Sequence, residues 1–329
     1  MSRTLSAQHD SFALSAPFRI SRGVKTAAEV VTVTVREGEA IGRGEAVPYP
    51  RYGESVASAL ASIEEARGLV ETGAGRDALL DALPAGAARN AIDCALWDLE
   101  AKLTGRSVAE AIGGAEPRLV ATALTIGIDA PDAMAKAAAA LADAPVLKVK
   151  VDANEPEAQI RAVRAAAPRA ALIVDPNESW DRALVEAMQG VLVETRIALL
   201  EQPVPADSDG WLEGFEPAVP ICADESVHVA ADLDLVERRY QAVNVKLDKA
   251  GGLTAALELA RAARTRGLGL MTGCMVSSSL SIAPALHLAL LSDFVDLDGP
   301  LWLRKDRPGG VRAEGGLLWP PAAGFWGTR

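Results

Sequence analysis

The stretch Val146-Leu147-Lys148-Val149-Lys150 decides the fold, because four later stretches repeat its pattern of a short, largely apolar run that ends in a charged side chain. The residues that end the five runs are Lys150, Asp175, Glu201, Asp224 and Lys246. They are separated by 25, 26, 23 and 22 residues, about the length of one β-strand followed by one α-helix. Five successive parallel strands would then present one ionisable group each at the same end of a sheet.

The segments between and beyond these strand ends predict a barrel of the TIM type. Apolar residues recur at intervals of three and four over 157–165, 182–193 and 254–263, as expected for helices between the strands. The rhythm continues through a seventh strand at 267–273 and ends at 294–296. A (β/α)8 barrel uses about 250 residues, so this chain of 329 residues has room for a second, smaller domain. The predicted fold class is α/β.

The first third of the chain predicts that smaller domain. Its expected elements are a strand at 31–35, a turn at 37–38, a return strand at 41–47 and helices over 54–70 and 88–103, the last ending at Gly105. A hairpin followed by helices is an α+β pattern. We predict an α+β domain over residues 1–116, the barrel over 117–305, and a C-terminal segment, 306–329, that packs back on the first domain.

Composition and charge favour a small-molecule ligand. The formal net charge is −11, which argues against a nucleic-acid partner because phosphate contacts need clustered Lys and Arg. The three cysteines form no CxxC pair, as expected in a reducing compartment. Residues 1–15 lack a continuous apolar core, so we expect neither a signal peptide nor a membrane anchor. The sequence predicts a soluble, cytoplasmic protein, and a homo-oligomer is left open.

Motifs along nearly the whole chain resemble the enolase superfamily, and within it the muconate-lactonising subgroup. The similarity is closest to the dipeptide epimerases, which act on L-Ala-D/L-Glu. The motifs are Lys148-Val149-Lys150, Asp175-Pro176-Asn177-Glu178-Ser179-Trp180, Glu201-Gln202-Pro203, Asp224-Glu225-Ser226 and Lys246-Leu247-Asp248-Lys249-Ala250-Gly251-Gly252. The resemblance implies a modified (β/α)7–8 barrel, with the smaller α+β domain as a cap over its mouth.

The resemblance also implies a site. Asp175, Glu201 and Asp224 would hold Mg²⁺, since carboxylate oxygens suit this hard cation. Lys150 and Lys246 come from opposite sides of the barrel, so one would remove a proton from the substrate α-carbon and the other would return one to the far face. Such a proton beside an ionised carboxylate is very weakly acidic, so the enediolate left by its removal must be stabilised electrostatically, here by the metal.

We expect the cation and the neighbouring Lys148 to lower the pKa of the catalytic lysines towards neutrality. Lys148 lies on the same strand face as Lys150, two residues away, and is assigned to the substrate carboxylate.

Other residues would choose the substrate. Asp296 and Asp298 fall where the eighth strand should end and point to one side. In dipeptide epimerases the matching pair holds the free α-ammonium. The segment 19–25 resembles a flexible loop that contacts the second side chain, with Lys25 at the position of a frequent arginine; whether Lys25 or Arg22 makes that contact is open. Thr125, and Ser277 to Ser279, are candidate contacts to the peptide backbone.

Other interpretations stay open. A single carboxylate at a strand end usually caps the next helix, but five charged groups at one spacing favour a site. o-Succinylbenzoate synthase and N-acylamino acid racemase activities are alternatives within the superfamily, and a non-catalytic dipeptide-binding protein is an alternative of another class. Glu225, Asp248 and Asn177 would support either the site or the fold. None of the three histidines is expected to be catalytic, and His287 is expected to pack in a helix.

Overall fold

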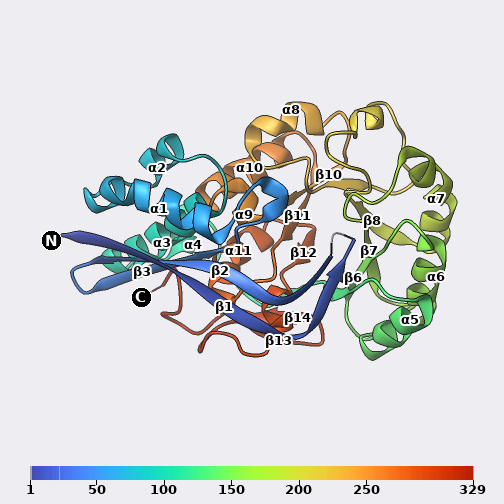
Figure 1. The fold of residues 1–329 in the computed structure, drawn as a ribbon, viewed down its shortest axis with the longest axis horizontal. Helices are drawn as coiled ribbons and strands as arrows, with labels where there is room; N and C mark the ends of the chain where they lie inside the picture. The colour runs from blue at the N-terminus through green and yellow to red at the C-terminus, as the bar shows by residue number, and fades with distance from the viewer. Residues whose placement is uncertain (1, 22, 329) are drawn as a thin grey trace.

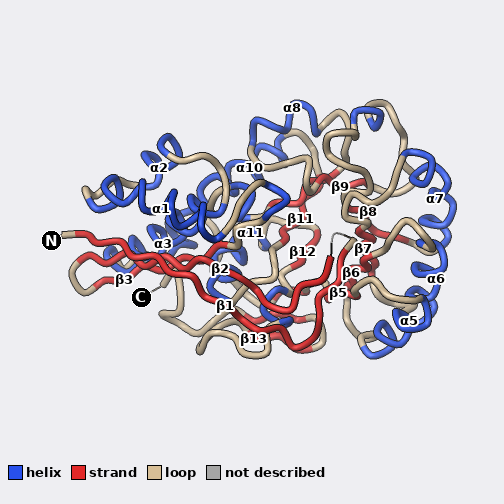
Figure 2. Tube along the Cα trace, in the orientation of Figure 1, coloured by secondary structure: helices blue, strands red, loops and turns tan. Residues whose placement is uncertain are grey.

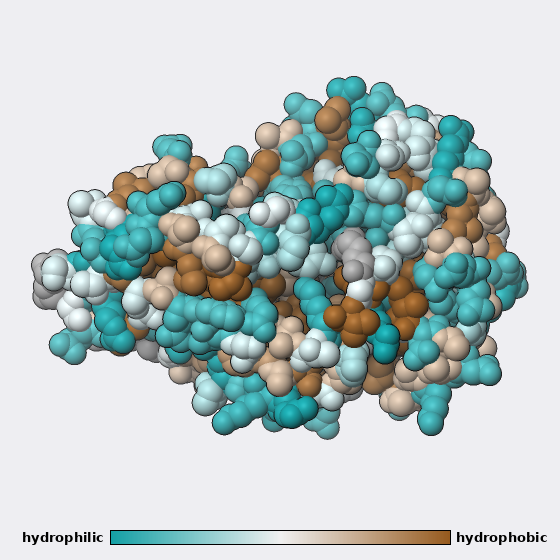
Figure 3. Space-filling model, viewed as in Figure 1, coloured by the Kyte–Doolittle hydropathy of each residue, from teal (hydrophilic) through white to brown (hydrophobic). Residues whose placement is uncertain are grey.

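The computed structural model describes residues 2–21 and 23–328. A layer of antiparallel strands and helices forms one side of the molecule, and a barrel surrounded by helices forms the other (Figure 1). The face drawn in Figure 3 is mostly hydrophilic, with apolar side chains in small separate groups. Among the described residues, no helix is both long enough and apolar enough to cross a membrane.

The barrel is one parallel sheet whose eight strands follow chain order. Ala123 N donates to Val295 O across the remaining gap, at 2.8 Å, and brings the two edges of the sheet together. The predicted α/β fold class is thus confirmed. The strands are β5 (Leu124–Ile126), β6 (Val146–Lys150), β7 (Ala171–Asp175), β8 (Ile197–Glu201), β9 (Ile221–Ala223), β10 (Ala242–Val245), β11 (Gly269–Gly273) and β12 (Phe294–Asp296).

Helices cover the outside of these strands (Figure 2). The helices predicted over 54–70, 88–103, 157–165, 182–193 and 254–263 are present, with ends that differ from the expected ones by one or two residues. The connection from β8 to β9 contains only a short 3-10 turn, Gly210–Leu212, so the barrel is a modified one. The helices are α5 (Pro131–Ala140), α6 (Pro156–Ala166), α7 (Arg182–Glu194), α8 (Leu233–Val236), α9 (Leu247–Ala250), α10 (Leu253–Thr265) and α11 (Ser279–Ala289).

The first part of the chain is an antiparallel sheet covered by helices. Its strands are β1 (Arg3–Ile20), β2 (Gly23–Glu37) and β3 (Ala40–Ala46), and its helices are α1 (Val56–Glu71), α2 (Arg76–Ala82), α3 (Ala87–Thr104) and α4 (Val108–Ile112). Gly105 ends α3 in a left-handed conformation, as predicted, with φ of 70°. The long β1–β2 hairpin crosses to the barrel, where its far end lies beside β6 and β7 (Figure 1).

The sequence-based expectation of a loop at 19–25 is wrong. Phe18 pairs with Lys25, Arg19 with Val24 and Ile20 with Gly23, so the hairpin remains a two-stranded ladder almost to its tip. Backbone pairing fixes Lys25 on a strand. Arg22 lies outside the described residues.

The C-terminal segment contacts both parts of the molecule. β13 (Arg312–Glu314) and β14 (Leu317–Trp319) form a small sheet with β4 (Val120–Ala121) below the barrel. Further on, Trp326 Nε1 donates to Arg43 O at 3.0 Å, and Gly327 N donates to Asp98 Oδ1 at 2.8 Å. The division at residues 116 and 305 stays a prediction.

The first domain depends on close contact between α3 and β3. The two elements share an apolar core that includes Ala46 of β3 and Ala91 and Leu99 of α3. At Gly44 a Cβ atom would collide with the carbonyl oxygen of Ala91 and lie 2.7 Å from Ala95 N. The absence of a side chain therefore allows the helix to rest directly on the strand.

We predict that Gly44→Ala destabilises the protein by about 3 kcal/mol, because the added methyl group meets helix backbone that cannot yield easily. Gly68→Ala is the matched control: this glycine lies exposed in α1 with nothing within 4 Å of an added Cβ, so the change should stabilise by about 0.5–1 kcal/mol. Urea unfolding of both variants measures the difference. Equal stability of the two would contradict the proposed contact.

Candidate active site

The carboxyl ends of the barrel strands bring the predicted charged residues together. Lys150, Asp175 and Glu201 are the last residues of β6, β7 and β8, and Asp224 and Lys246 directly follow β9 and β10. All five side chains are buried. Of these five, Lys150 and Lys246 line a small cavity of about 60 Å³ between the barrel mouth and the β1–β2 hairpin, whereas Asp175, Glu201 and Asp224 are not among its lining residues. The predicted site residues that line it are Lys25, Thr125, Lys148, Lys150, Lys246, Asp296 and Asp298.

Lys148 is the centre of this charge cluster. Its Nζ lies 3.1 Å from Asp175 Oδ2, 2.7 Å from Glu201 Oε2 and 2.8 Å from Asp296 Oδ2. Burial opposes the charged form of Lys148, but these carboxylates outweigh it and hold its pKa well above the usual value. Lys148 is therefore a fixed cation on the floor of the cavity, and its predicted contact with a substrate carboxylate stays a prediction.

The two candidate bases face different carboxylates. Lys150 pairs with Asp175, and Lys246 Nζ lies 2.6 Å from Asp224 Oδ2. At Lys246, burial opposes the charged form, yet Asp224 outweighs burial and raises the pKa; the decrease expected from a bound cation stays a prediction. The pKa is raised because the nearest charge to Lys246 is negative, whereas the expectation rested on positive neighbours.

Lys249 is a member of the cluster whose role sequence reasoning missed. Its Nζ pairs with Asp224 Oδ1 at 2.6 Å and donates to the carbonyl oxygens of Asp224 and Asn244. Both carboxylate oxygens of Asp224 thus contact lysines, and the pKa of Asp224 is held far below its usual value, since Lys246 and Lys249 outweigh the effect of burial. The repeat of lysine in Lys246-Leu247-Asp248-Lys249 was the available signal.

The three candidate metal ligands form a set of buried carboxylates. Burial raises the pKa of Glu201, and the negative charge of Asp175 adds to the effect. In Asp175 burial is outweighed by Lys150 and Lys148, and the pKa falls to about 2. Glu201 Oε1 accepts a hydrogen bond from Asn244 Nδ2 at 2.8 Å. The buried Oε2 has an ion-pair contact with Lys148 Nζ, at 2.7 Å, but no hydrogen bond.

This donor set fits a hard divalent cation. It offers oxygen atoms only, from three neighbouring strands, and one of those atoms is buried without a hydrogen bond. Within residues 2–21 and 23–328, no three acidic, His or Cys side chains already surround a common point at metal-binding distance. The lysine ammonium groups lie among the carboxylates instead.

A buried hydrogen-bond network supports the ends of β8 and β9. Gln202 has an unusual positive φ of 31°, and its Oε1 accepts hydrogen bonds from Asp224 N at 2.8 Å and Ser226 N at 3.2 Å. Its Nε2 donates to Tyr240 Oη at 2.9 Å, and that hydroxyl donates to Asp209 Oδ2 at 2.7 Å. Tyr240 and Asp209 were missed because they lie on separate connections and share no spacing with the strand ends.

Asp296 and Asp298 lie together at the end of β12, on the cavity. Asp298 Oδ2 accepts hydrogen bonds from Thr125 N at 2.8 Å and from Trp302 Nε1 at 3.3 Å. Burial, together with the charge of Asp296, raises the pKa of Asp298 to about 6. Thr125 thus contributes both its backbone and its side chain to Asp298. Cationic ligands would be attracted here.

Several other candidates point elsewhere. Ser278 donates to Glu45 and Ser279 donates to Asp306, so neither hydroxyl is directed at the cavity. Asp248 accepts hydrogen bonds from Val47 N at 2.8 Å and Asn90 Nδ2 at 2.9 Å, which joins the first domain to the barrel. Of the histidines, His287 is buried in α11, where burial lowers its pKa to about 4.

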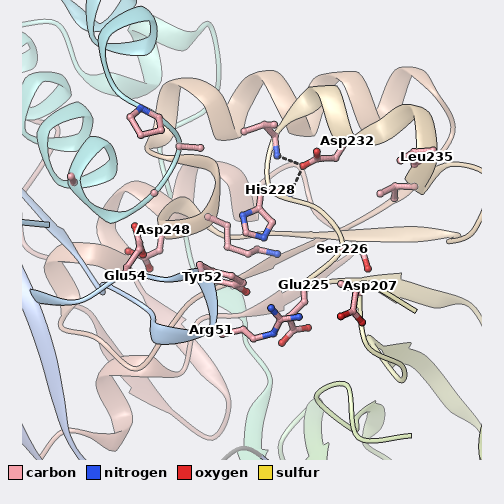
Figure 4. Close-up of a pocket in the computed structure, with 18 of the residues that line it drawn as sticks. Arg51, Tyr52, Glu54, Asp207, Glu225, Ser226, His228, Asp232, Leu235 and Asp248 are labelled. Atoms are coloured by element: carbon pink, nitrogen blue, oxygen red, sulfur yellow. Dashed lines mark hydrogen bonds between the residues drawn. The ribbon is translucent and has the colours of Figure 1, made fainter. Parts of the chain in front are cut away.

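The cap side of the cavity is aromatic. Lys25 Nζ lies 4.5 Å from the centre of the Tyr49 ring, and Phe18 and Ile20 of the hairpin complete that wall. A second cavity, of about 950 Å³, adjoins the first, and Tyr52 and Glu225 line both. Tyr52 and His228 both line the larger cavity (Figure 4), and their ring centres lie 4.6 Å apart.

Known families and proteins match the whole chain. The family described as "Mandelate racemase / muconate lactonizing enzyme, N-terminal domain" matches residues 2–113, and the one described as "Enolase C-terminal domain-like" matches residues 132–325. The L-Ala-D/L-Glu epimerase of Escherichia coli K12 is 47% identical over 92% of this chain and 95% of its own length. The N-acetyl-D-glutamate racemase of a Pseudoalteromonas species is 41% identical over 91% of this chain and 95% of its own.

Solved structures agree with these matches. An enolase family member from Agrobacterium tumefaciens, described as homologous to dipeptide epimerases and as holding sodium and L-Ala-L-Glu, superposes with a TM-score of 0.96 and 47% identity. The superposition covers 99% of this chain and 100% of that one. A dipeptide epimerase from Enterococcus faecalis, complexed with Mg and L-Leu-L-Tyr, has a TM-score of 0.89 at 29% identity, over 100% of this chain and 99% of that one.

We predict that Tyr240→Phe destabilises the protein by about 1–3 kcal/mol, because it removes a buried hydroxyl that both accepts from Gln202 and donates to the Asp209 carboxylate. Ser208→Ala removes an exposed hydroxyl from the same connection and should change stability by less than about 0.5 kcal/mol. Denaturant titration compares the two variants. Equal stability of Tyr240→Phe and the parent would show that the network is dispensable.

Proposed function

The chain belongs to the mandelate racemase/muconate-lactonising family of enolase-like proteins, as its motifs predicted, and from this membership we propose that it is a Mg²⁺-dependent dipeptide epimerase. It inverts the α-carbon of the second residue, with L-Ala-D/L-Glu as the substrate pair. The observation that carries the proposal is the pair of buried lysines, Lys150 and Lys246, which line one cavity from strands four places apart in an eight-stranded barrel.

Each lysine serves one face of the α-carbon. Because β6 and β10 lie across the barrel from each other, a carbon held between them meets one amine on each side. One amine accepts the α-proton, and the opposite ammonium donates a different proton to the far face, which inverts the centre. In this structure Lys150 pairs with Asp175 and Lys246 pairs with Asp224, which holds both amines at the cavity.

The metal would be held by Asp175, Glu201 and Asp224. When bound, the metal would offset the negative charge that develops on the substrate carboxylate. It would also neutralise part of the charge of Asp224, which is the group that raises the pKa of Lys246. Lys148 adds a fixed positive charge beside the same carboxylates. Burial of all these groups strengthens each electrostatic contact, since water does not screen it.

The dipeptide's free ammonium would be held by Asp296 and Asp298. Both carboxylates line the cavity and are buried, and a buried carboxylate gains most from a cationic partner. Lys25, or Arg22, would contact the side chain of the second residue. Glutamate is the proposed residue there, because both of the similar relatives described above act, by name, on a glutamate derivative.

We further propose that the substrate derives from murein peptides and that the enzyme works in the cytoplasm without nucleic-acid or membrane partners. The acidic net charge of −11 supports the absence of nucleic acid.

A second candidate is racemisation of an N-acylated glutamate. Its support is the 41% identity to the N-acetyl-D-glutamate racemase. Such a substrate has no ammonium group, so Asp296 and Asp298 would face it without a cationic ligand. This mismatch favours the dipeptide.

We predict that, in deuterated water with Mg²⁺, the enzyme exchanges the α-proton of the second residue of L-Ala-L-Glu and accumulates the other epimer. Lys150→Ala and Lys246→Ala should each abolish epimerisation, by at least about a thousandfold, because one of the two proton-transfer groups is lost. Each variant should still exchange the α-proton of one epimer, and the two variants should differ in which. NMR measures the exchange, and EDTA should stop it.

Lys136→Ala, on an exposed face of α5, is the control that should keep full activity. The proposal fails if no dipeptide exchanges its α-proton, or if both lysine variants continue to epimerise.

We predict that Asp298→Asn lowers kcat/KM for L-Ala-L-Glu by about 10–100-fold, because it removes a charged partner of the ammonium group. Activity on N-acetyl-L-Glu should change little, and the exposed Asp143→Asn should affect neither substrate. Steady-state kinetics on the two substrates check this. Unchanged turnover of the dipeptide by Asp298→Asn would favour the N-acylamino acid racemase instead.

A further inference from the structure

We infer that Trp302 is a positioning residue that couples recognition of the substrate ammonium by Asp298 to the seating of the β1–β2 hairpin over the cavity. The inference rests on the proposed function and concerns the same site. It assigns a role to a residue outside the family motifs noted in the sequence.

The first contact holds the carboxylate of Asp298. The indole Nε1 of Trp302 donates to Asp298 Oδ2 at 3.3 Å, and the backbone N of Thr125 donates to the same oxygen at 2.8 Å. Thr125 is fixed by its pairing with Lys148 in the sheet. The side chain of Thr125 also hydrogen-bonds Asp298, so both groups of Thr125 come from β5. Trp302 adds a donor from the turn after Asp298, and the orientation of its ring decides whether this further hydrogen bond is made.

The second contact fixes that ring. Phe18, near the tip of the β1–β2 hairpin, meets the Trp302 ring edge-on, with centres 4.7 Å apart and planes at 78°. This is a favourable geometry for two aromatic rings. Phe18 lines the cavity together with Ile20 and Lys25 of the same hairpin. A shift of the hairpin tip would therefore remove the packing that orients the indole.

The backbone around these residues supports the coupling. Pairing of β1 with β2 is interrupted between Ala13 and Phe18, and there the chain after Trp302 pairs with β1: Leu14 bridges to Leu303, and Arg304 N donates to Ala13 O at 2.8 Å. The hairpin is thus anchored to the barrel just before Phe18. Beyond this anchor, the Phe18–Trp302 contact links the tip to the ammonium site.

The turn that carries Trp302 is itself tightly placed. The 3-10 turn Gly299–Trp302 begins directly after Asp298, and a Cβ on Gly299 would lie 2.6 Å from Met275 O and 3.1 Å from Cys274 Sγ. Asp298 and Trp302 are therefore held one turn apart with little freedom in the backbone. The adjustable element is the indole side chain, which is half-buried.

A purely structural role has a different signature. Phe12, Phe18 and Trp302 all pack on one apolar cluster between the cap and the barrel. If Trp302 only filled space in this cluster, its replacement would lower stability and would affect every substrate to the same degree. A positioning role instead affects the discrimination between substrates with and without the ammonium group.

The test compares L-Ala-L-Glu with N-propionyl-L-Glu, in which a hydrogen atom replaces the ammonium group. The ratio of the two kcat/KM values for α-proton exchange measures what the ammonium contributes. Trp302→Phe keeps a ring against Phe18 but removes the donor. The ratio should therefore fall about tenfold, because kcat/KM for L-Ala-L-Glu falls while kcat/KM for N-propionyl-L-Glu stays the same. Phe18→Ala keeps the donor but removes the packing that orients it, so it should also lower the ratio. In the double variant, the ratio should be no lower than in Trp302→Phe alone, because both changes act on the same hydrogen bond.

Phe12→Ala is the matched control, since it removes a ring from the same cluster away from Asp298 and should leave the ratio unchanged. The inference is overturned if Trp302→Phe lowers activity on both substrates equally or leaves the ratio at the parent value. Should Trp302→Phe not fold, Phe18→Ala decides by the same criterion. The proposed function fails if the parent enzyme exchanges the α-proton of neither substrate, or of both equally well. The inference about Trp302 alone fails if the parent enzyme prefers the dipeptide and Trp302→Phe keeps that preference.

Discussion

The structure depends on the balance of buried charge at the mouth of the barrel. Four lysines and four carboxylates are joined there by ion pairs, and every one of them is nearly inaccessible to water. Removing an ion from water costs several kcal/mol unless an opposite charge and good hydrogen bonds compensate. Each member of the cluster therefore requires the others, and the parallel strands that deliver them must end at the same level. The members are Lys148, Lys150, Lys246, Lys249, Asp175, Glu201, Asp224 and Asp296.

The same balance gives the site its chemistry. A cluster of paired charges is a poor ligand for neutral molecules, but it can exchange partners with a ligand that brings both a carboxylate and an ammonium group. Lys148 and Asp296 illustrate this, since they pair with each other across the cavity floor at 2.8 Å. A dipeptide would offer an opposite charge to each of them, so the proposed recognition of both ends of the substrate would start from one ion pair.

The cap adds the selective part of the site. Buried polar contacts join it to the barrel behind the cavity, among them Asp248 with Val47 and Glu45 with Ser278 and Arg307. These contacts hold the base of the cap, whereas the β1–β2 hairpin reaches across to the cavity (Figure 1). The hairpin, to which we assign the contact with the second residue, is held near its tip by side-chain contacts that include that of Phe18 with Trp302.

The sequence by itself determined the strand-and-helix rhythm, the α/β class, the position of most helices and the group of charged strand ends. It could do so because βα units repeat at one length, and parallel strands place their carboxyl ends together. Tertiary structure alone decided which charges pair, that Lys148 is their centre, that the pKa of Lys246 is raised, and that Lys249, Tyr240 and Trp302 support the site. These contacts join residues from separate loops, or depend on which side chains pack against each other, so no periodic spacing in the sequence predicts them. Tertiary structure also decided the length of β1, since many of its residues are not buried and are held by backbone pairing with β2 rather than by an apolar pattern.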